Sequence, residues 1–248
     1  MSKSLNIFGF HSLESLLKST PELVLKVFIQ IGREDKRVLS LLDEIALQKI
    51  SILKVDKNKL DQLSNGETHQ GVISEIIMPT FPGEKILIES IKNSSKKPLV
   101  LILDSIQDPR NLGACLRSAN AAGVDFVIIN KDGSAPINSL VYKASAGAIN
   151  SLQIFLVTNI VRTIKAIQNE GIWVIGLDGN ATTSIYDVNL ADSTAIVMGS
   201  EGKGIRQLIK KTCDQLVIIP MSGNIESLNV SVATGIALFE SMRQRKTS

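Results

Sequence analysis

The feature that most constrains the fold of this 248-residue chain is a series of short, almost uninterrupted runs of Val, Ile and Leu in its C-terminal part. Helix-like segments separate several of the runs. A strand that is apolar at nearly every position is typical of a parallel sheet that helices cover on both faces. The pattern therefore predicts an α/β domain over residues 98–248. The predicted strands are Leu99–Asp104, Val124–Asn130, Gln153–Val157, Ile172–Leu177, Ala195–Gly199 and Leu216–Pro220.

The N-terminal part reads as a smaller α/β unit over residues 1–77. Strands are expected at 24–30, 51–55 and 71–77, and helices at 12–17, 36–48 and 58–63. Pro79, Pro82 and Gly83 then break the pattern, and a polar stretch follows that ends at Pro98. We therefore predict a linker at 78–97 between the two domains.

The composition and the cysteine count argue against a membrane protein, a secreted protein and a metal-binding protein. Hydrophobic residues make up 44% of the chain, which is enough for a sizeable core. No apolar run reaches the roughly 18 residues that span a bilayer, and the N-terminus does not resemble a secretory signal. Cys115 and Cys213 fit neither a zinc spacing nor a disulfide framework. We expect a cytoplasmic protein with no membrane span and no metal site, whose net charge of +3 permits RNA binding without demanding it.

The loop after the first predicted strand of the C-terminal domain contains a helix start. Asp108-Pro109 combines a capping carboxylate with a residue tolerated in the first helical turn. Asn111 falls at the helix N-terminus, and Arg117 lies off the apolar stripe of the helix. Taken alone, the segment is more readily explained as an ordinary capped helix carrying a surface arginine. The stripe is formed by Leu112, Cys115, Leu116 and Ala119.

The second loop, Gly199-Ser200-Glu201-Gly202-Lys203-Gly204, is glycine-rich and lies between a strand and a helix. Glycines in that place favour a close approach of backbone to a ligand. The spacing fits neither a Walker A loop nor a dinucleotide-binding loop. It is therefore either a plain turn or part of a different nucleotide-like site.

The third loop runs from Pro220 to Ser227-Leu228-Asn229 and is followed by a helix-like segment that looks buried nearly all round. One interpretation is a Ser/Asn cap over a core helix. The other is a binding loop held between two rigid elements.

Together the three loops resemble the SpoU (TrmH) family of S-adenosylmethionine-dependent RNA ribose 2′-O-methyltransferases, within the SPOUT superfamily. The N-terminal part resembles the ribosomal-L30-like substrate-binding domain that precedes the catalytic domain in such enzymes. The resemblance implies a trefoil knot in the C-terminal domain and a homodimer with its active site close to the subunit interface. In the C-terminal part the matching motifs, in the order of the family, are Asp108–Ala114 with Arg117-Ser118, then Met198–Gly202, then Ile219–Met221 through Ser231. In the N-terminal part they are Ile7–His11, Gly32–Arg37 and His69–Val72.

The resemblance also implies roles for individual residues. The polar active-site positions of the family match Asn111, Arg117, Glu201, Ser227 and Asn229. The positions that contact S-adenosylmethionine match Gly199, Ile219 and Leu228. Our candidates for RNA contacts are Arg33, Lys36, Arg37 and Arg110.

The expected chemistry is an in-line displacement, which needs close alignment and a more nucleophilic hydroxyl, and no metal. The family's assignment makes Arg117 the proton acceptor. Because a guanidinium stays protonated at working pH, we expect Arg117 instead to hold the target phosphate or ribose and to stabilise alkoxide charge. Glu201 could cap a helix or orient Arg117. Asn229 could cap the last helix or position the nucleophile.

Likeness over the whole chain favours one substrate, a guanosine ribose in the peptidyl-tRNA-binding loop of 23S rRNA, free or in an assembling large subunit. A tRNA ribose methyltransferase of the same family is the alternative, although its simplest members lack the L30-like domain. A non-catalytic RNA-binding homologue is disfavoured by the complete polar set. The failed phosphate-loop patterns disfavour another nucleotide-binding α/β enzyme.

Overall fold

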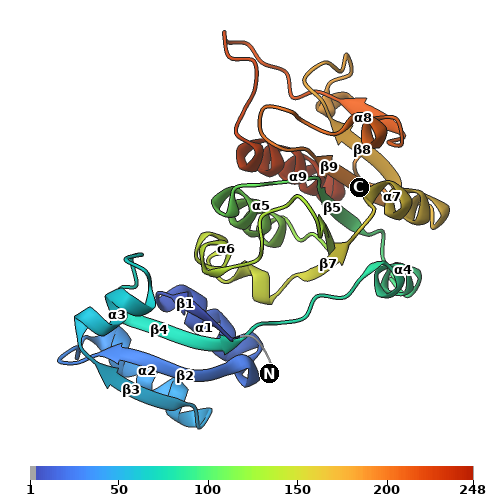
Figure 1. Cartoon of the computed structure of the whole chain (residues 1–248). Coiled ribbons are helices and arrows are strands. Elements are labelled where there is room, and N and C mark those ends of the chain that lie inside the picture. The colour runs from blue at the N-terminus through green and yellow to red at the C-terminus, as the bar shows by residue number, and fades with distance from the viewer. Residues whose placement is uncertain (1–3, 248) are drawn as a thin grey trace. The chain divides into compact units, whose positions relative to one another are not determined.

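The computed structural model describes residues 4–247, and these form two compact units (Figure 1). One is made by the chain up to Thr80 together with Ile137–Ser151; the other is made by Phe81–Pro136 and the chain from Leu152 onward. The segment expected as a linker contains a helix, α4 (Glu84–Lys92). Its Leu87 and Ile91 are buried in the core of the second unit. Their i, i+4 spacing was the signal for that helix, and the neighbouring prolines and glycine obscured it.

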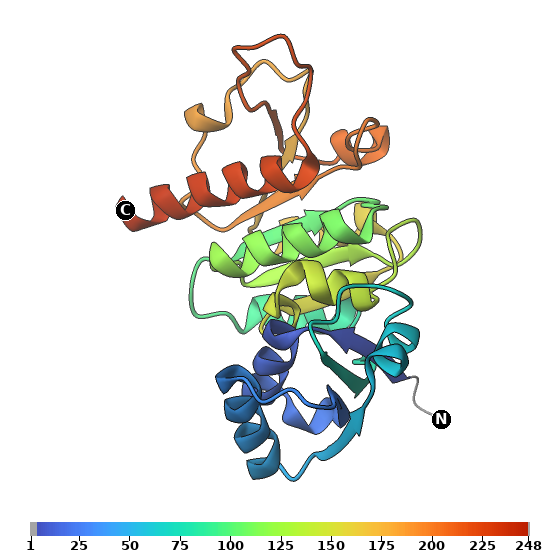
Figure 2. The same cartoon turned by 90° about the vertical axis from the view of Figure 1, so that its left-hand side faces the viewer.

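The first unit is built on a four-stranded mixed sheet of order β1-β4-β2-β3 (Figure 2). β4 runs antiparallel to β1 and β2, whereas β3 lies parallel to β2. The strands predicted at 24–30 and 51–55 are confirmed. The strands are β1 (Ser4–Phe8), β2 (Val24–Gln30), β3 (Ser51–Val55) and β4 (Val72–Ile77). The helices are α1 (Phe10–Ser19), α2 (Lys36–Leu47), α3 (Lys57–Leu63) and α6 (Ser139–Ser145), with short 3-10 turns η1 (Pro21–Leu23) and η2 (Ala148–Asn150).

Helix α6 joins this unit although it lies far along the sequence, and it was not predicted. The Asn138 side chain caps it by accepting from two backbone N–H groups. Ser15 Oγ donates to the Gly147 carbonyl over 2.9 Å, and Lys143 Nζ lies 2.9 Å from Glu67 Oε2. These long-range contacts hold a seven-residue helix that is too short to be stable by itself.

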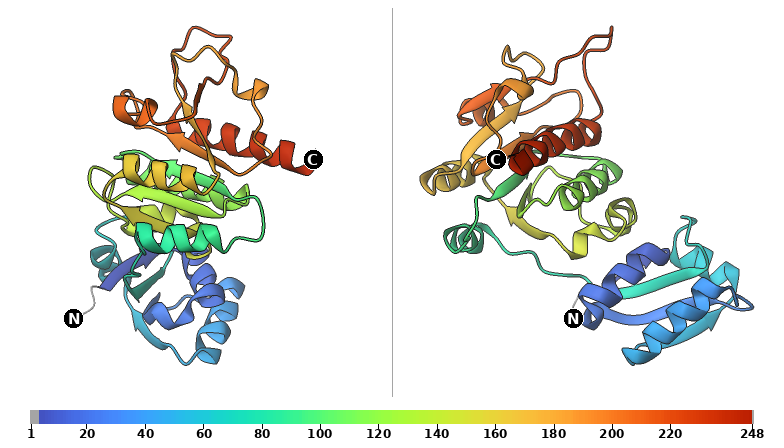
Figure 3. Two further views of the ribbon diagram at one scale, coloured as in Figure 1. Left: turned by 90° about the vertical axis from the view of Figure 1, so that its right-hand side faces the viewer. Right: turned by 180° about the vertical axis from the view of Figure 1, so that it is seen from behind.

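The second unit is a six-stranded, fully parallel sheet of order β10-β8-β9-β5-β6-β7 (Figure 3). The predicted α/β class and the strand positions are confirmed. The last strand ends earlier than expected because Ile218 leaves the ladder and pairs with the backbone of Thr183 and Ile185. The strands are β5 (Leu99–Leu103), β6 (Phe126–Asn130), β7 (Gln153–Val157), β8 (Trp173–Leu177), β9 (Thr194–Met198) and β10 (Gln215–Val217).

Helices cover both faces of this sheet, as the apolar strands predict (Figure 1). α4, α7 (Ile160–Asn169) and α8 (Gln207–Lys210) share a core with one face. α5 (Pro109–Ala121) and α9 (Val230–Thr247) pack together on the other. A 3-10 turn, η3 (Ile185–Asp187), follows β8. No helix in the part of the chain that the structure describes is long and apolar enough to cross a membrane.

The expectation that the last helix is buried nearly all round is wrong. Thr234, Ala237, Leu238 and Ser241 are fully buried, but Val232 is 50% exposed and Phe239 44% exposed. α9 packs against α5 and β9 through one face only. Apolar side chains at i and i+7 therefore lie together on its outer face.

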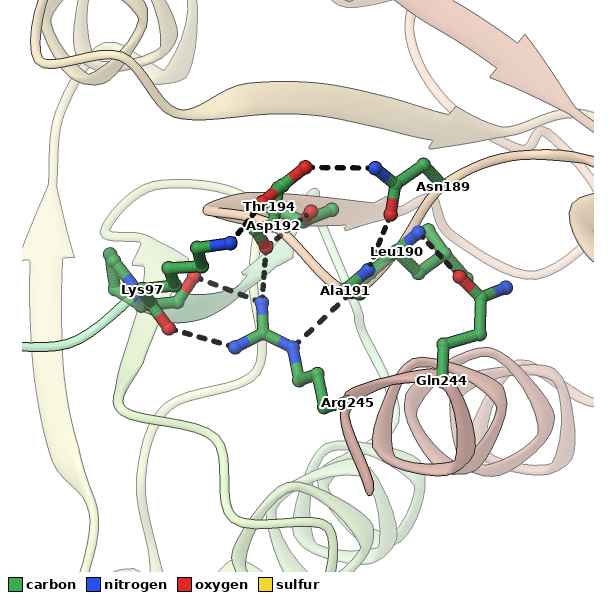
Figure 4. A network of polar contacts seen from close by, with 9 residues as sticks. Lys97, Asn189, Leu190, Ala191, Asp192, Thr194, Gln244 and Arg245 are labelled. Carbon is green, nitrogen blue, oxygen red and sulfur yellow. Dashed lines mark hydrogen bonds and ion pairs between the residues drawn. The ribbon is translucent and has the colours of Figure 1, made fainter. Parts of the chain in front are cut away.

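The C-terminal end of α9 is anchored by Arg245 (Figure 4). Its guanidinium donates to the carbonyls of Lys97 over 2.8 Å, Pro98 over 3.3 Å and Leu190 over 3.2 Å, and also to that of Asp192. Burial lowers the pKa of Arg245 from its usual value, against the influence of nearby carboxylates. One side chain thus ties the helix to the segments that precede β5 and β9.

Replacing Arg245 with Met should destabilise the second unit by about 2–4 kcal/mol, because several carbonyls lose a charged donor. Urea unfolding followed by circular dichroism measures this loss. Lys246→Met, at an exposed neighbour, is the control and should change the free energy of unfolding by less than about 0.5 kcal/mol. Equal stability of the two variants would contradict the anchoring role.

Candidate active site

The three predicted loops meet at one edge of the parallel sheet. β5 and β9 are neighbouring parallel strands, so the loops that follow them start side by side. α9, which follows the third loop, packs along α5. The predicted start of α5 is confirmed: Asp108 Oδ1 accepts from the backbone N–H of Arg110 over 2.7 Å, with Pro109 as the first helical residue. The predicted apolar stripe is also confirmed, since all four of its side chains are fully buried.

Glu201 is the centre of a polar cluster that joins all three loops. Its Oε1 accepts from Asn111 Nδ2 over 2.6 Å and from Asn229 Nδ2 over 2.7 Å. Asn229 Nδ2 also lies 3.1 Å from Asn111 Oδ1. Hydrogen bonds to a carboxylate are shorter and stronger than those between neutral groups. The cluster therefore fixes two amide side chains around one negative charge at the edge of the sheet.

Asn229 caps the last helix, which is one of the two roles that its sequence position allowed. Its Oδ1 accepts from Ser231, from the backbone N–H over 2.9 Å and from Oγ over 2.6 Å, which caps α9. Its Nδ2 faces the other way, toward Glu201 and Asn111. Ser231 is a member of the site that sequence reasoning missed. The signal was its place two residues after an N-cap asparagine.

The cluster does not include every predicted polar residue. Arg117 is exposed and makes no hydrogen bond or ion pair with any residue in the range 4–247. Glu201 therefore does not orient Arg117 in this structure; it holds Asn111 and Asn229 instead. Ser227 is exposed too, in the loop before α9. Arg110 lies exposed on the first turn of α5.

Gly199, the first of the predicted cofactor positions, begins a tightly folded loop. A Cβ at Gly199 would overlap the backbone of Gly204 and Ile205, so only glycine fits there. The Gly204 N–H donates to the Ser200 carbonyl over 2.8 Å, and Gly204 itself has a left-handed φ of 64°. Within the described residues, the backbone groups of Gly199 make no hydrogen bond to other backbone groups.

Ile219 and Leu228 complete the set of predicted cofactor positions. Both side chains are half-buried. Ile219 follows Ile218, whose backbone is held by Thr183 and Ile185, and its own backbone makes no such bond in the described part of the chain. Half-buried apolar side chains beside open backbone groups suit a ligand with an adenine ring and a polar tail.

Two of the three predicted RNA contacts in the first unit, Arg33 and Arg37, lie over Phe10. The guanidinium groups of Arg33 and Arg37 lie 5.1 Å and 4.5 Å from the centre of its ring. Arg37 Nε also donates to Glu14 over 3.0 Å, and this hydrogen bond lowers the pKa of the Glu14 carboxyl. Lys36 is exposed and makes no ion pair within residues 4–247. Arg33 and Arg37 therefore lie over the buried ring of Phe10, and each is also paired with a carboxylate.

Replacing Gly199 with Ala should displace the loop at 199–205, because the new methyl group meets backbone that cannot move away easily. We expect a loss of about 1–3 kcal/mol in the free energy of unfolding. Gly179→Ala is the matched control, since a Cβ there meets nothing within 4 Å. Thermal unfolding of both variants tests the prediction, and equal melting temperatures would contradict it.

Comparisons with known proteins agree with this architecture. Residues 98–239 match the SpoU rRNA Methylase family, and residues 6–82 match the family described as RNA 2′-O ribose methyltransferase substrate binding. The chain is 47% identical to the 23S rRNA (guanosine-2′-O-)-methyltransferase RlmB of Haemophilus ducreyi, over 96% of this chain and 97% of that protein. The crystal structure of an RNA 2′-O ribose methyltransferase, 26% identical, aligns over 99% of this chain and 90% of that one with a TM-score of 0.82. The TrmH/SpoU tRNA modifying enzyme of A. aeolicus, 27% identical, aligns over 66% of this chain and 85% of that one with a TM-score of 0.56. The chain belongs to the SpoU methylase family.

Proposed function

We propose that this protein transfers a methyl group from S-adenosylmethionine to the ribose 2′-hydroxyl of a guanosine in 23S rRNA, in the peptidyl-tRNA-binding loop. The observation that carries the proposal is the Asn111–Glu201–Asn229 cluster, in which one residue from each of the three motifs contributes a hydrogen-bonding side chain. Near-full-length similarity to RlmB of Haemophilus ducreyi supports the choice of substrate. A ribosomal substrate would place the reaction in the cytoplasm.

Each residue in the site has a proposed task. Gly199, Ile219 and Leu228 would hold S-adenosylmethionine, which supplies the methyl group when bound. The cluster around Glu201 would position the ribose for in-line attack. Arg117, exposed and without a partner in residues 4–247, would bind a phosphate or the ribose and stabilise alkoxide charge. Ser227, in the same loop as Leu228, would add a hydroxyl at the rim of the site.

RNA binding is proposed to involve both units. Arg33, Lys36 and Arg37 would supply positively charged side chains on the first, and Arg110 lies beside Asn111 on the second. The ion pairs of Arg33 and Arg37 are exposed, so exchange of a carboxylate for a phosphate would cost little. Such contacts with phosphates would fix the position of the protein on the RNA. Recognition of the nucleotide sequence would depend on other groups.

We also propose that the enzyme is a homodimer with a knotted catalytic domain. The outer face of α9 supports the dimer, because Val232 and Phe239 are both about half exposed there. Exposed apolar side chains that share one helix face are typical of a protein–protein contact. The knot and the division into a substrate domain and a catalytic domain follow from family membership and stay predictions.

A tRNA ribose methyltransferase is the second candidate. The tRNA modifying enzyme of A. aeolicus aligns with only 66% of this chain, whereas the relative from Haemophilus ducreyi covers 96% of it. The separate match of residues 6–82 to a substrate-binding family also favours the ribosomal substrate.

Replacing Arg117 with Ala should abolish methylation and leave cofactor affinity nearly unchanged, because Arg117 would contact RNA and developing charge only. Incorporation of labelled methyl groups into 23S rRNA and calorimetric titration with S-adenosylmethionine measure the two effects. Lys131→Ala, also an exposed cation of the second unit, is the control. Substantial turnover by the Arg117 variant would rule out the proposed role.

Deleting the gene should remove one 2′-O-methylguanosine from 23S rRNA. Mapping of 2′-O-methyl groups in total RNA, with and without the gene, measures this. A plasmid copy of the gene should restore the mark, and the Arg117→Ala copy should not. An unchanged rRNA map with an altered tRNA would support the second candidate instead.

A further inference from the structure

A fully buried carboxylate lies at the end of β5, where the loop to α5 begins. Asp104 follows β5, and its side chain is 0% exposed. Its backbone N–H donates to the Met198 carbonyl at the end of β9 over 2.8 Å. A buried charge is costly unless charged or hydrogen-bonding partners surround it. The partners of Asp104 are therefore a strong constraint on the loops near it.

Most of those partners come from Arg206, at the end of the glycine-rich loop. Arg206 Nε lies 2.8 Å and Nη2 2.7 Å from Asp104 Oδ1, and the Arg206 backbone N–H donates to Oδ2 over 3.2 Å. Ser105 Oγ adds a further bond to Oδ1 over 3.0 Å. The Arg206 side chain is itself 54% exposed, so it reaches from the surface down to a buried charge.

This pair closes the loop that carries Glu201. At one end, Gly199 is pressed against the backbone of Gly204 and Ile205. At the other, Ile205 is buried in the core and Arg206 is bonded to Asp104. Glu201 lies between these two anchors. Its position relative to the sheet is thus set from both sides of a short loop.

The same carboxylate also precedes α5. The segment between Asp104 and α5 is held by the Ala135 N–H, which donates to the Ile106 carbonyl over 2.7 Å. Asn111, on the first turn of α5, then donates to Glu201. Asp104 is therefore connected to Glu201 by two routes, one through Arg206 and one through α5 and Asn111.

We propose that Asp104 and Arg206 are positioning residues that hold Glu201, and with it Asn111 and Asn229, in the geometry required for methyl transfer. This rests on the proposed function, but the closed loop exists independently of any ligand. Neither residue touches the three-residue cluster, so both act through the loop. A displacement of about 1 Å in such a site can reduce turnover by about 100-fold.

The test compares wild type, Asp104→Asn, Arg206→Gln and Arg206→Lys. Arg162→Gln is the matched control: it breaks another arginine–carboxylate pair of the second unit, the 2.9 Å contact of Arg162 with Glu84. Hydrogen exchange of residues 199–206 in the free protein reports loop closure. Methylation of 23S rRNA, normalised to the folded fraction, gives kcat and the KM for RNA.

We expect faster exchange of residues 199–206 and a kcat lower by roughly 10- to 100-fold in Asp104→Asn and Arg206→Gln, with the KM for RNA changed less than threefold. Arg206→Lys, which keeps the charge opposite the buried carboxylate, should recover part of kcat. Unchanged exchange, or a kcat per folded molecule equal to that of Arg162→Gln, would overturn the proposal. If wild type fails to methylate 23S rRNA while exchange still rises in the variants, the proposed function is wrong and the positioning of the loop stands.

Discussion

The parallel pairing of β5 with β9 is the constraint on which the rest of the site depends. The register runs from Leu99 opposite Thr194 to Leu103 opposite Met198. Because both strands end at the same level, the loop to α5 and the glycine-rich loop begin side by side. Asp104 continues the ladder with one more hydrogen bond, to Met198. The hydrogen bond between Asn111 and Glu201 is built on this junction.

Two polar networks share the junction, and they differ in burial. The Asp104 carboxylate is buried and takes its bonds from Arg206 and Ser105. The cluster of Glu201 with Asn111 and Asn229 is exposed or half-buried. An exposed cluster can exchange partners when a substrate arrives, whereas a fully buried carboxylate cannot lose its partners cheaply. The buried carboxylate of Asp104 thus holds the loops in place, and the exposed cluster around Glu201 is free to rearrange its hydrogen bonds.

The parts of the fold that could be predicted from the sequence are the strands whose positions follow from the pattern of apolar residues. β5, β6 and β9 are buried at every position, and their continuous apolar runs predicted them. Prediction failed for elements whose existence or buried face depends on tertiary contacts. α6 is stabilised by partners more than 70 residues away in sequence, such as Glu67. α9 reads as apolar all round, yet only packing against α5 determines which of its faces is covered.

The sequence by itself determined the chemical character of the site: the residue types in three loops, their order, and strands whose carboxyl ends must share an edge. Only the tertiary structure decided which of those residues meet. Glu201 bonds Asn111 and Asn229 and leaves Arg117 to solvent. Asp104 and Arg206 form a pair across 102 residues that no local pattern signals. The physical reason is that hydrogen bonds depend on positions to within a few tenths of an ångström, which packing sets and spacing along a chain does not.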